Sequence, residues 1–277
     1  MMLMRWLVWC CTFGLFAAPA WAGTDAATAE SLMRKSGLWE QLVDIAPQVR
    51  VGMLASIQRS GRKPSDAEIG RLSRAVDAAY SVQRLRSGCL SAIAKDLDNN
   101  QVPALRRWYD GPTGRAITRL EQALSRQGGQ QATLERGAVL LERMPAARRR
   151  VLDEIVLATR SAELMAELTI STTLATQQGA ASVSPNAAGP SADEMKAALD
   201  AQRQQLIRTF SAISLASFAF AYSSLSTAEL VGYADFLKSG AGRHFSAVGS
   251  RAFTAAMLDA AAELGRALPG SRDKVNT

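Results

Sequence analysis

Apolar residues recur at three- and four-residue spacing along most of the chain, and no stretch alternates apolar and polar residues as a strand does. One example is the series Leu72, Val76, Ala79 and Tyr80. Such spacing places apolar side chains on one face of a helix. The pattern therefore predicts an all-α fold, a helical bundle.

Two S-x-x-E sequences, at 65–68 and 226–229, mark helix starts. In such a capping box, the Ser and Glu side chains each satisfy a backbone N–H group of the first turn. Together with the periodicity, these signals predict helices near 27–36, 38–59 with a break at Pro47, 66–81, 83–97, 101–110, 113–127, 132–143, 146–175, 193–207, 209–225, 227–238 and 241–267. The uncharged stretch 177–192, which is rich in Gly, Pro, Ser and Ala, predicts a flexible loop.

The segment between Arg208 and Glu229 carries no charged residue and has the length of a membrane span. Serines are interspersed through it, and a capping box interrupts it near its end. A helix that is apolar all round can be either a buried central helix or a membrane span. The serines and the capping box favour the buried central helix.

The first 22 residues have the layout of a secretory signal peptide: a charged start, the apolar run 6–18, and the small-residue triplet Ala20-Trp21-Ala22. An apolar run of about thirteen residues is too short for a bilayer core, which needs roughly 20. We therefore expect a periplasmic protein that is cleaved after Ala22, with no transmembrane span in the mature chain.

Cleavage would leave Cys89 as the only thiol, and His244 is the only histidine of the whole sequence. A free cysteine is among the most buried residue types, so we expect Cys89 inside a helix interface rather than in an intermolecular disulfide. Zinc and iron–sulfur sites need several Cys or His ligands. The composition therefore predicts no metal site and no cofactor.

Positive charge is concentrated in the first half of the mature chain. Residues 23–160 carry 22 basic and 15 acidic side chains, whereas residues 161–277 carry nine and ten. On an exported protein this balance favours an envelope protein, anionic lipid or glycopolymer as partner over nucleic acid. The simpler interpretation is that scattered arginines form solvated helix faces.

A shift of 128 residues aligns the segment 97–115 with the segment 225–243. In each copy an apolar helix precedes a short helix that ends in an aromatic residue, and a Gly-containing corner leads into another helix. This repeat predicts two related units, 23–145 and 146–277, with the flexible loop inside the second.

At these motifs the sequence resembles the bacterial exported family catalogued as domain of unknown function 2059. The family pattern is L-S-x-x-E-L, a spacer, and then F-Y-x-S-P-x-G followed by a basic residue. The second copy matches at Leu225, Ser226, Glu229, Leu230, Phe236, Ser239 and Gly242, and departs at Leu237 and Gly240. The first copy keeps the aromatic pair, Pro112 and Gly114 but lacks the capping box. The resemblance implies an exported helical protein and names no reaction.

The pairs Gly114-Arg115 and Gly242-Arg243 lie where a helix is expected to begin. One interpretation is an anion site, where the arginine and the first-turn N–H groups bind a phosphate or carboxylate. The other is a corner clasp, in which the arginine binds a carbonyl of the preceding short helix or an acid such as Asp110. Repetition within one chain favours the clasp, because a repeated device serves folding.

Three aromatic residues, Trp108, Tyr109 and Phe236, lie near the ends of the short helices. They are expected to be core plugs between helices, with a ligand cage as the alternative. No nucleophile motif surrounds His244, so no catalytic residue is assigned.

The function that the sequence favours is binding or scaffolding in the bacterial envelope. The alternative is the binding of a lipid or other apolar or anionic ligand between helices. A hydrolytic enzyme is the function that the sequence favours least. A ligand binder would show an apolar pocket, whereas a scaffold would show an exposed apolar patch.

Overall fold

The structure, a computed structural model, describes residues 23–59, 61, 63–126, 130–170 and 192–267. These residues form helices and short connections, with no strand among them, which confirms the predicted all-α class. The helices are α1 (Ala26–Lys35), α2 (Leu38–Gln41), α3 (Ile45–Arg59), α4 (Asp66–Ala79), α5 (Val82–Asp96), the 3-10 turn η1 (Asn99–Gln101), α6 (Val102–Tyr109), α7 (Pro112–Arg126), α8 (Gln130–Glu142), α9 (Ala146–Thr159), an unlabelled helical segment 161–170, α11 (Ala192–Ala221), α12 (Thr227–Lys238) and α13 (Gly240–Ala267). The predicted signal peptide lies outside the described residues, as does the predicted loop 177–192 except for its last residue.

Both predicted capping boxes are present. The Ser226 hydroxyl accepts a hydrogen bond from the Glu229 N–H at 3.2 Å, and the Glu229 carboxylate accepts one from the Ser226 N–H at 2.7 Å. Ser65 and Glu68 make the same pair of bonds at the start of α4. Each box satisfies N–H groups that have no partner inside the helix.

Three predicted helix boundaries are wrong. The predicted break at Pro47 lies instead at residues 42–44, and Pro47 occupies the first turn of α3, where its missing N–H costs no hydrogen bond. The predicted helix 146–175 is interrupted at Arg160, which has a φ of 52°. The two helices predicted on either side of Arg208 are one helix, α11, because arginine is a good helix former and does not end a helix.

Two hydrophobic clusters form the core. The first gathers residues of α1–α6 around α13, with Leu85, Cys89 and Ile93 of α5 fully buried. The second gathers residues of α7, α9, α11 and α12, with Leu152 and Ile155 of α9 fully buried. The clusters do not follow the predicted boundary at 145/146. Helix α13 comes from the second predicted unit but packs in the first cluster, and α7 comes from the first predicted unit but packs in the second cluster. The two halves of the sequence therefore interlock.

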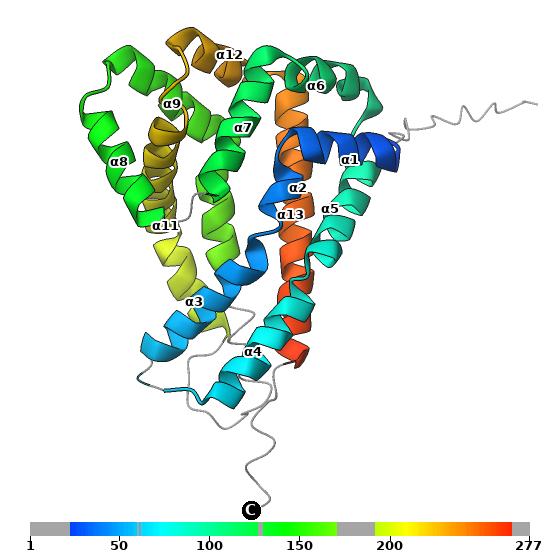
Figure 1. Cartoon of the computed structure of the whole chain (residues 1–277), viewed down its shortest axis with the longest axis vertical. Helices are drawn as coiled ribbons and strands as arrows, with labels where there is room; N and C mark the ends of the chain where they lie inside the picture. The colour runs from blue at the N-terminus through cyan, green and yellow to red at the C-terminus, as the bar shows by residue number, and fades with distance from the viewer. Residues whose placement is uncertain (1–22, 60, 62, 127–129, 171–191, 268–277) are drawn as a thin grey trace, which may run out of the picture.

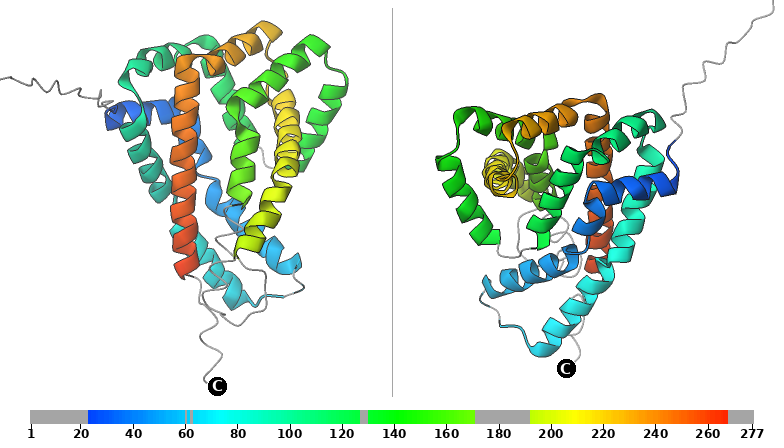
Figure 2. Two further views of the ribbon diagram at one scale, coloured as in Figure 1. Left: turned by 180° about the vertical axis from the view of Figure 1, so that it is seen from behind. Right: turned by 45° about the horizontal axis from the view of Figure 1, so that its top comes forward.

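The arrangement of the helices is visible in Figures 1 and 2. The long helix α13 runs beside α5 and α4, while α8, α9 and α11 pack together on the other side of the molecule. The short helices α6 and α12 lie at one common end. The corners that follow α6 and α12 are therefore brought to the same end of the bundle.

The apolar run after Arg208 lies at the end of α11, where Ala219 and Tyr222 enter the second cluster. Within the described ranges, no helix is long and apolar enough to span a bilayer. Cys89 is buried against α13, and burial raises the pKa of its thiol to about 11. A thiol with so high a pKa is a weak nucleophile at neutral pH.

Candidate functional site

The two motif corners are built in the same way. The Arg115 guanidinium donates a hydrogen bond to the Asp110 carbonyl, and the Arg243 guanidinium donates one to the Lys238 carbonyl. Each acceptor lies at the end of the preceding short helix, at the same distance along the chain. This is the hydrogen bond that the clasp interpretation requires, and it is made equally in both copies.

The two corner glycines allow the backbone to pass very close to the preceding helix. A Cβ on Gly114 would lie 2.2 Å from the Trp108 carbonyl oxygen, and a Cβ on Gly242 would lie 2.0 Å from the Phe236 carbonyl oxygen. Because backbone atoms cannot rotate away as a side chain can, only glycine fits at either position.

The aromatic residues of the two motifs meet between the two core clusters. The rings of Trp108 and Phe236, which lie at matching positions of the repeat, stack with centroids 4.4 Å apart. Tyr109 meets Phe236 edge-on at 5.7 Å. These residues pack against the hydrophobic clusters and line neither of the two cavities described below. Their arrangement is that of core plugs.

A half-buried carboxylate beside these rings, Glu121, was not predicted from the sequence. Glu121 accepts hydrogen bonds from the hydroxyls of Tyr222 at 2.5 Å and Tyr233 at 3.2 Å. Burial raises the pKa of Glu121, and the two hydrogen bonds offset this only in part. The signal that could have found it is its place on the apolar stripe of α7, four residues after the buried Ile117.

The raised pKa of Glu121 predicts a pH dependence of stability. The stability that this group provides is present below its ordinary pKa of 4.5 and is lost as the pH rises through the higher folded-state pKa. Glu121→Gln keeps an acceptor for Tyr222 and Tyr233 without the charge. We expect it to melt about 2–4 °C above the parent at pH 8 and to match the parent near pH 4.

Thermal unfolding followed by circular dichroism across this pH range is the measurement. Glu142→Gln is the matched control, because Glu142 is an exposed carboxylate of α8 and its variant should follow the parent. Parallel pH profiles for Glu121→Gln and the parent would contradict the prediction.

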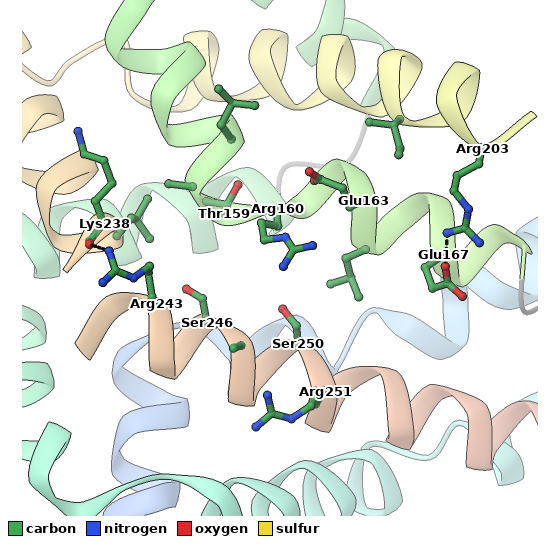
Figure 3. Close-up of a pocket in the computed structure, with 16 residues that line it drawn as sticks. Thr159, Arg160, Glu163, Glu167, Arg203, Lys238, Arg243, Ser246, Ser250 and Arg251 are labelled. Carbon is green, nitrogen blue, oxygen red and sulfur yellow. Dashed lines mark hydrogen bonds and ion pairs between the residues drawn. The ribbon is translucent and has the colours of Figure 1, made fainter. Parts of the chain in front are cut away.

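A cleft of about 800 Å³ opens between the end of α9, the segment 161–170, α11 and α13 (Figure 3). Its apolar lining comes from Leu157, Ala158, Leu164, Ile207, Leu237 and Ala247. Its charged lining comprises five cations, Arg160, Arg203, Lys238, Arg243 and Arg251, against two carboxylates, Glu163 and Glu167. The walls of the cleft are therefore apolar, and its lining residues by themselves carry a net charge of +3.

Most cations of the cleft have partners. Arg203 pairs with Glu167 and with Asp200, and Lys238 pairs with Glu154 at 2.7 Å. Arg251 lies 3.7 Å from Asp96, and Arg243 makes the clasp described above. The Arg160 side chain differs, because it has no hydrogen bond or ion pair within the part of the chain that the structure describes.

Arg160 also stands out in its backbone. Its φ of 52° and ψ of 25° lie in the left-handed region, where it separates α9 from the segment 161–170. This conformation costs about 1–2 kcal/mol for a residue with a Cβ. Strained residues of this kind cluster at functional sites.

A shallower apolar recess of about 470 Å³ lies between α8 and α11 and is lined by Glu135, Arg136, Val139, Leu140 and Phe220. Val139 is 50% exposed and Leu140 37%. Its two charges balance, so it favours no sign of charge in a partner. This recess is the kind of apolar patch that a scaffold would present.

The structure places His244 in a backbone contact. Its Nε2 accepts a hydrogen bond from the Asp98 N–H at 3.0 Å, which ties α13 to the start of η1. Across the described ranges, no three His, Cys, Asp or Glu side chains are grouped to hold a metal ion. Comparison of the chain with known protein families, curated proteins and solved structures finds no match.

Proposed function

We propose that this protein binds an anionic amphiphile, a molecule with an apolar chain and a negatively charged end, in the cleft beside α13. The observation that carries the proposal is the combination, in one cleft, of apolar walls with two arginines, Arg160 and Arg243, that form no ion pair with any described residue. Its volume lies within the range of about 300–1,000 Å³ that ligand pockets occupy. Leu157, which lines the cleft and is 70% exposed, offers further apolar surface for the apolar chain of the ligand.

The sequence supports a place for this binding in the bacterial envelope. The predicted signal peptide with cleavage after Ala22 and the resemblance to the exported family of unknown function 2059 both favour a periplasmic protein. Anionic lipids and their breakdown products are amphiphiles of the required charge in that compartment. Scaffolding through the recess at Val139 and Leu140 is the second candidate function.

The direct test fills the cleft from α13. Ala247 is exposed and lines the cleft, so Ala247→Trp should occupy space that an acyl chain would use. We expect the parent to bind oleate in isothermal titration calorimetry and the variant to bind at least about tenfold more weakly, a loss of about 1.4 kcal/mol. Ala255→Trp is the matched control, because Ala255 is equally exposed on α13 but does not line the cleft.

Either of two results would overturn the proposal. The first is that the parent shows no heat of binding with oleate or with the uncharged monoolein, in which case the cleft holds no acyl ligand. The second is that Ala247→Trp and Ala255→Trp bind oleate equally well, in which case the ligand lies elsewhere. If neither result is obtained, native mass spectrometry of the protein purified from the envelope identifies the natural ligand.

The two motif corners provide a second pair of variants that can be compared. Arg115→Ala and Arg243→Ala each remove one clasp hydrogen bond, so both should lower the melting temperature by about 2–4 °C, or about 1 kcal/mol. Only Arg243 also lines the cleft, so Arg243→Ala alone should weaken oleate binding, by about threefold. Equal melting of both variants and the parent would contradict the clasp.

A further inference from the structure

Three hydrogen-bond donors face one another across the cleft in Figure 3. The Arg160 guanidinium extends into the cleft from the junction between α9 and the segment 161–170, and Ser246 and Ser250 lie across from it on α13, with the Ser250 hydroxyl pointing toward it. The two serines are four residues apart, so they lie on the same face of the helix. None of these three side chains has a hydrogen bond or ion pair to any described residue.

The carboxylates of the cleft do not neutralise this group of donors. Glu167 is paired with Arg203 at the far end of the cleft. The Glu163 carboxylate lies on the α11 side of the segment 161–170, whereas the three donors lie on its α13 side. The space between Arg160 and the two serines is therefore lined by donors.

The left-handed backbone conformation of Arg160 directs its own side chain toward this space. Had α9 continued as the predicted helix 146–175, position 160 would have stayed within a regular helical turn. The left-handed conformation instead ends α9 and begins the next segment, with the Arg160 N–H bonded to the Leu157 carbonyl. The cost of this conformation is consistent with a binding role, because strain persists where function uses it.

We propose that Arg160, Ser246 and Ser250 bind the oxyanion end of the ligand, a phosphate or a carboxylate. This inference rests on the proposed function, because the apolar part of the same ligand would lie against Leu164 and Ile207. A planar guanidinium can bind two oxygens of such a group, and the hydroxyls bind it from the facing helix. The pairing of one fixed charge with two neutral donors suits a single negatively charged group.

The test uses two variants that preserve the fold. Arg160→Gly removes the guanidinium and relieves the left-handed strain, so it should melt at or above the parent temperature. Ser246→Ala/Ser250→Ala removes both hydroxyls and places a better helix former at each position. Arg149→Ala is the control for loss of one positive charge, since Arg149 is exposed on α9 away from the cleft.

Calorimetry with four probes separates the ligand classes: oleate, oleoyl lysophosphatidate, uncharged monoolein and inorganic phosphate. We expect Arg160→Gly to bind both anionic lipids at least about tenfold more weakly and the serine variant about threefold more weakly. Both should bind monoolein as the parent does, and Arg149→Ala should match the parent throughout. The preferred anionic lipid identifies the head group as carboxylate or phosphate, and the phosphate arm shows whether the free ion suffices.

The outcomes distinguish this inference from the proposed function. If the parent binds acyl ligands but both variants keep its preference for anionic over uncharged lipid, the oxyanion assignment is wrong and the cleft function stands. If no acyl ligand binds but inorganic phosphate raises the melting temperature of the parent and not of Arg160→Gly, the oxyanion site stands and the proposed function is wrong.

Discussion

Gly242→Ala is expected to lower the melting temperature by about 6–12 °C, a loss of about 3 kcal/mol for a chain of this size. The added Cβ would lie 2.0 Å from the Phe236 carbonyl oxygen and 3.0 Å from the Leu237 Cα. Both contacts are with backbone, so α12 and α13 would have to move apart at the corner. Thermal unfolding followed by circular dichroism measures the effect.

Gly114→Ala should behave in the same way at the other corner, where the Cβ would lie 2.2 Å from the Trp108 carbonyl oxygen. Gly249→Ala is the matched control, because nothing lies within 4 Å of a Cβ at this helical position of α13. That variant should gain about 1 kcal/mol from the higher helix propensity of alanine. If Gly242→Ala had the same melting temperature as Gly249→Ala, at or above that of the parent, the result would contradict the close-approach argument.

The features that could be predicted from the sequence depend on residues close together in the chain. The capping boxes at Ser65 and Ser226 need partners only three residues away, so the motif is sufficient to locate them. The clasp of Arg243 is also local, since its acceptor is five residues earlier. Helix class follows from a three- to four-residue period for the same reason.

The features that could not be predicted depend on tertiary contacts. Arg160 adopts a left-handed conformation although its local sequence continues the helical period, so only the surrounding packing can account for the break. The cleft joins Arg160 to Ser246 and Ser250, which are far away in the sequence and carry no shared motif. Neither serine differs in its local sequence from a solvated helical serine.

The pairing of helices also lies beyond what a repeat can predict. The repeat predicts that α6 and α12 have similar surroundings, but it does not say whether each copy closes its own core. In the structure α13 packs against α5, and Trp108 stacks on Phe236, so contacts between the copies are a large part of the core. That the two units are related stays a prediction, which the matched corners and the stacked rings support.

Gly137→Ala is expected to be as damaging as the corner substitutions, with a loss of about 3 kcal/mol and a melting temperature about 6–12 °C lower. Gly137 lies inside α8, where the sequence offers no reason for a glycine. A Cβ there would lie 2.0 Å from the Ala216 carbonyl oxygen and 2.7 Å from its carbon. The backbones of α8 and α11 therefore touch at this point, and alanine would force the two helices apart.

Hydrogen exchange should locate the damage in Gly137→Ala to α8 and α11 and leave the first cluster around α5 and α13 protected. Adding Ala216→Gly should not restore stability, because the obstacle is the carbonyl of residue 216 and not its side chain. Gly232→Ala, at a helical position of α12 with nothing within 4 Å, should instead stabilise the protein slightly. If Ala216→Gly did restore the melting temperature, the contact between α8 and α11 would be made by side chains, and the cost of separating their backbones could not be the cause.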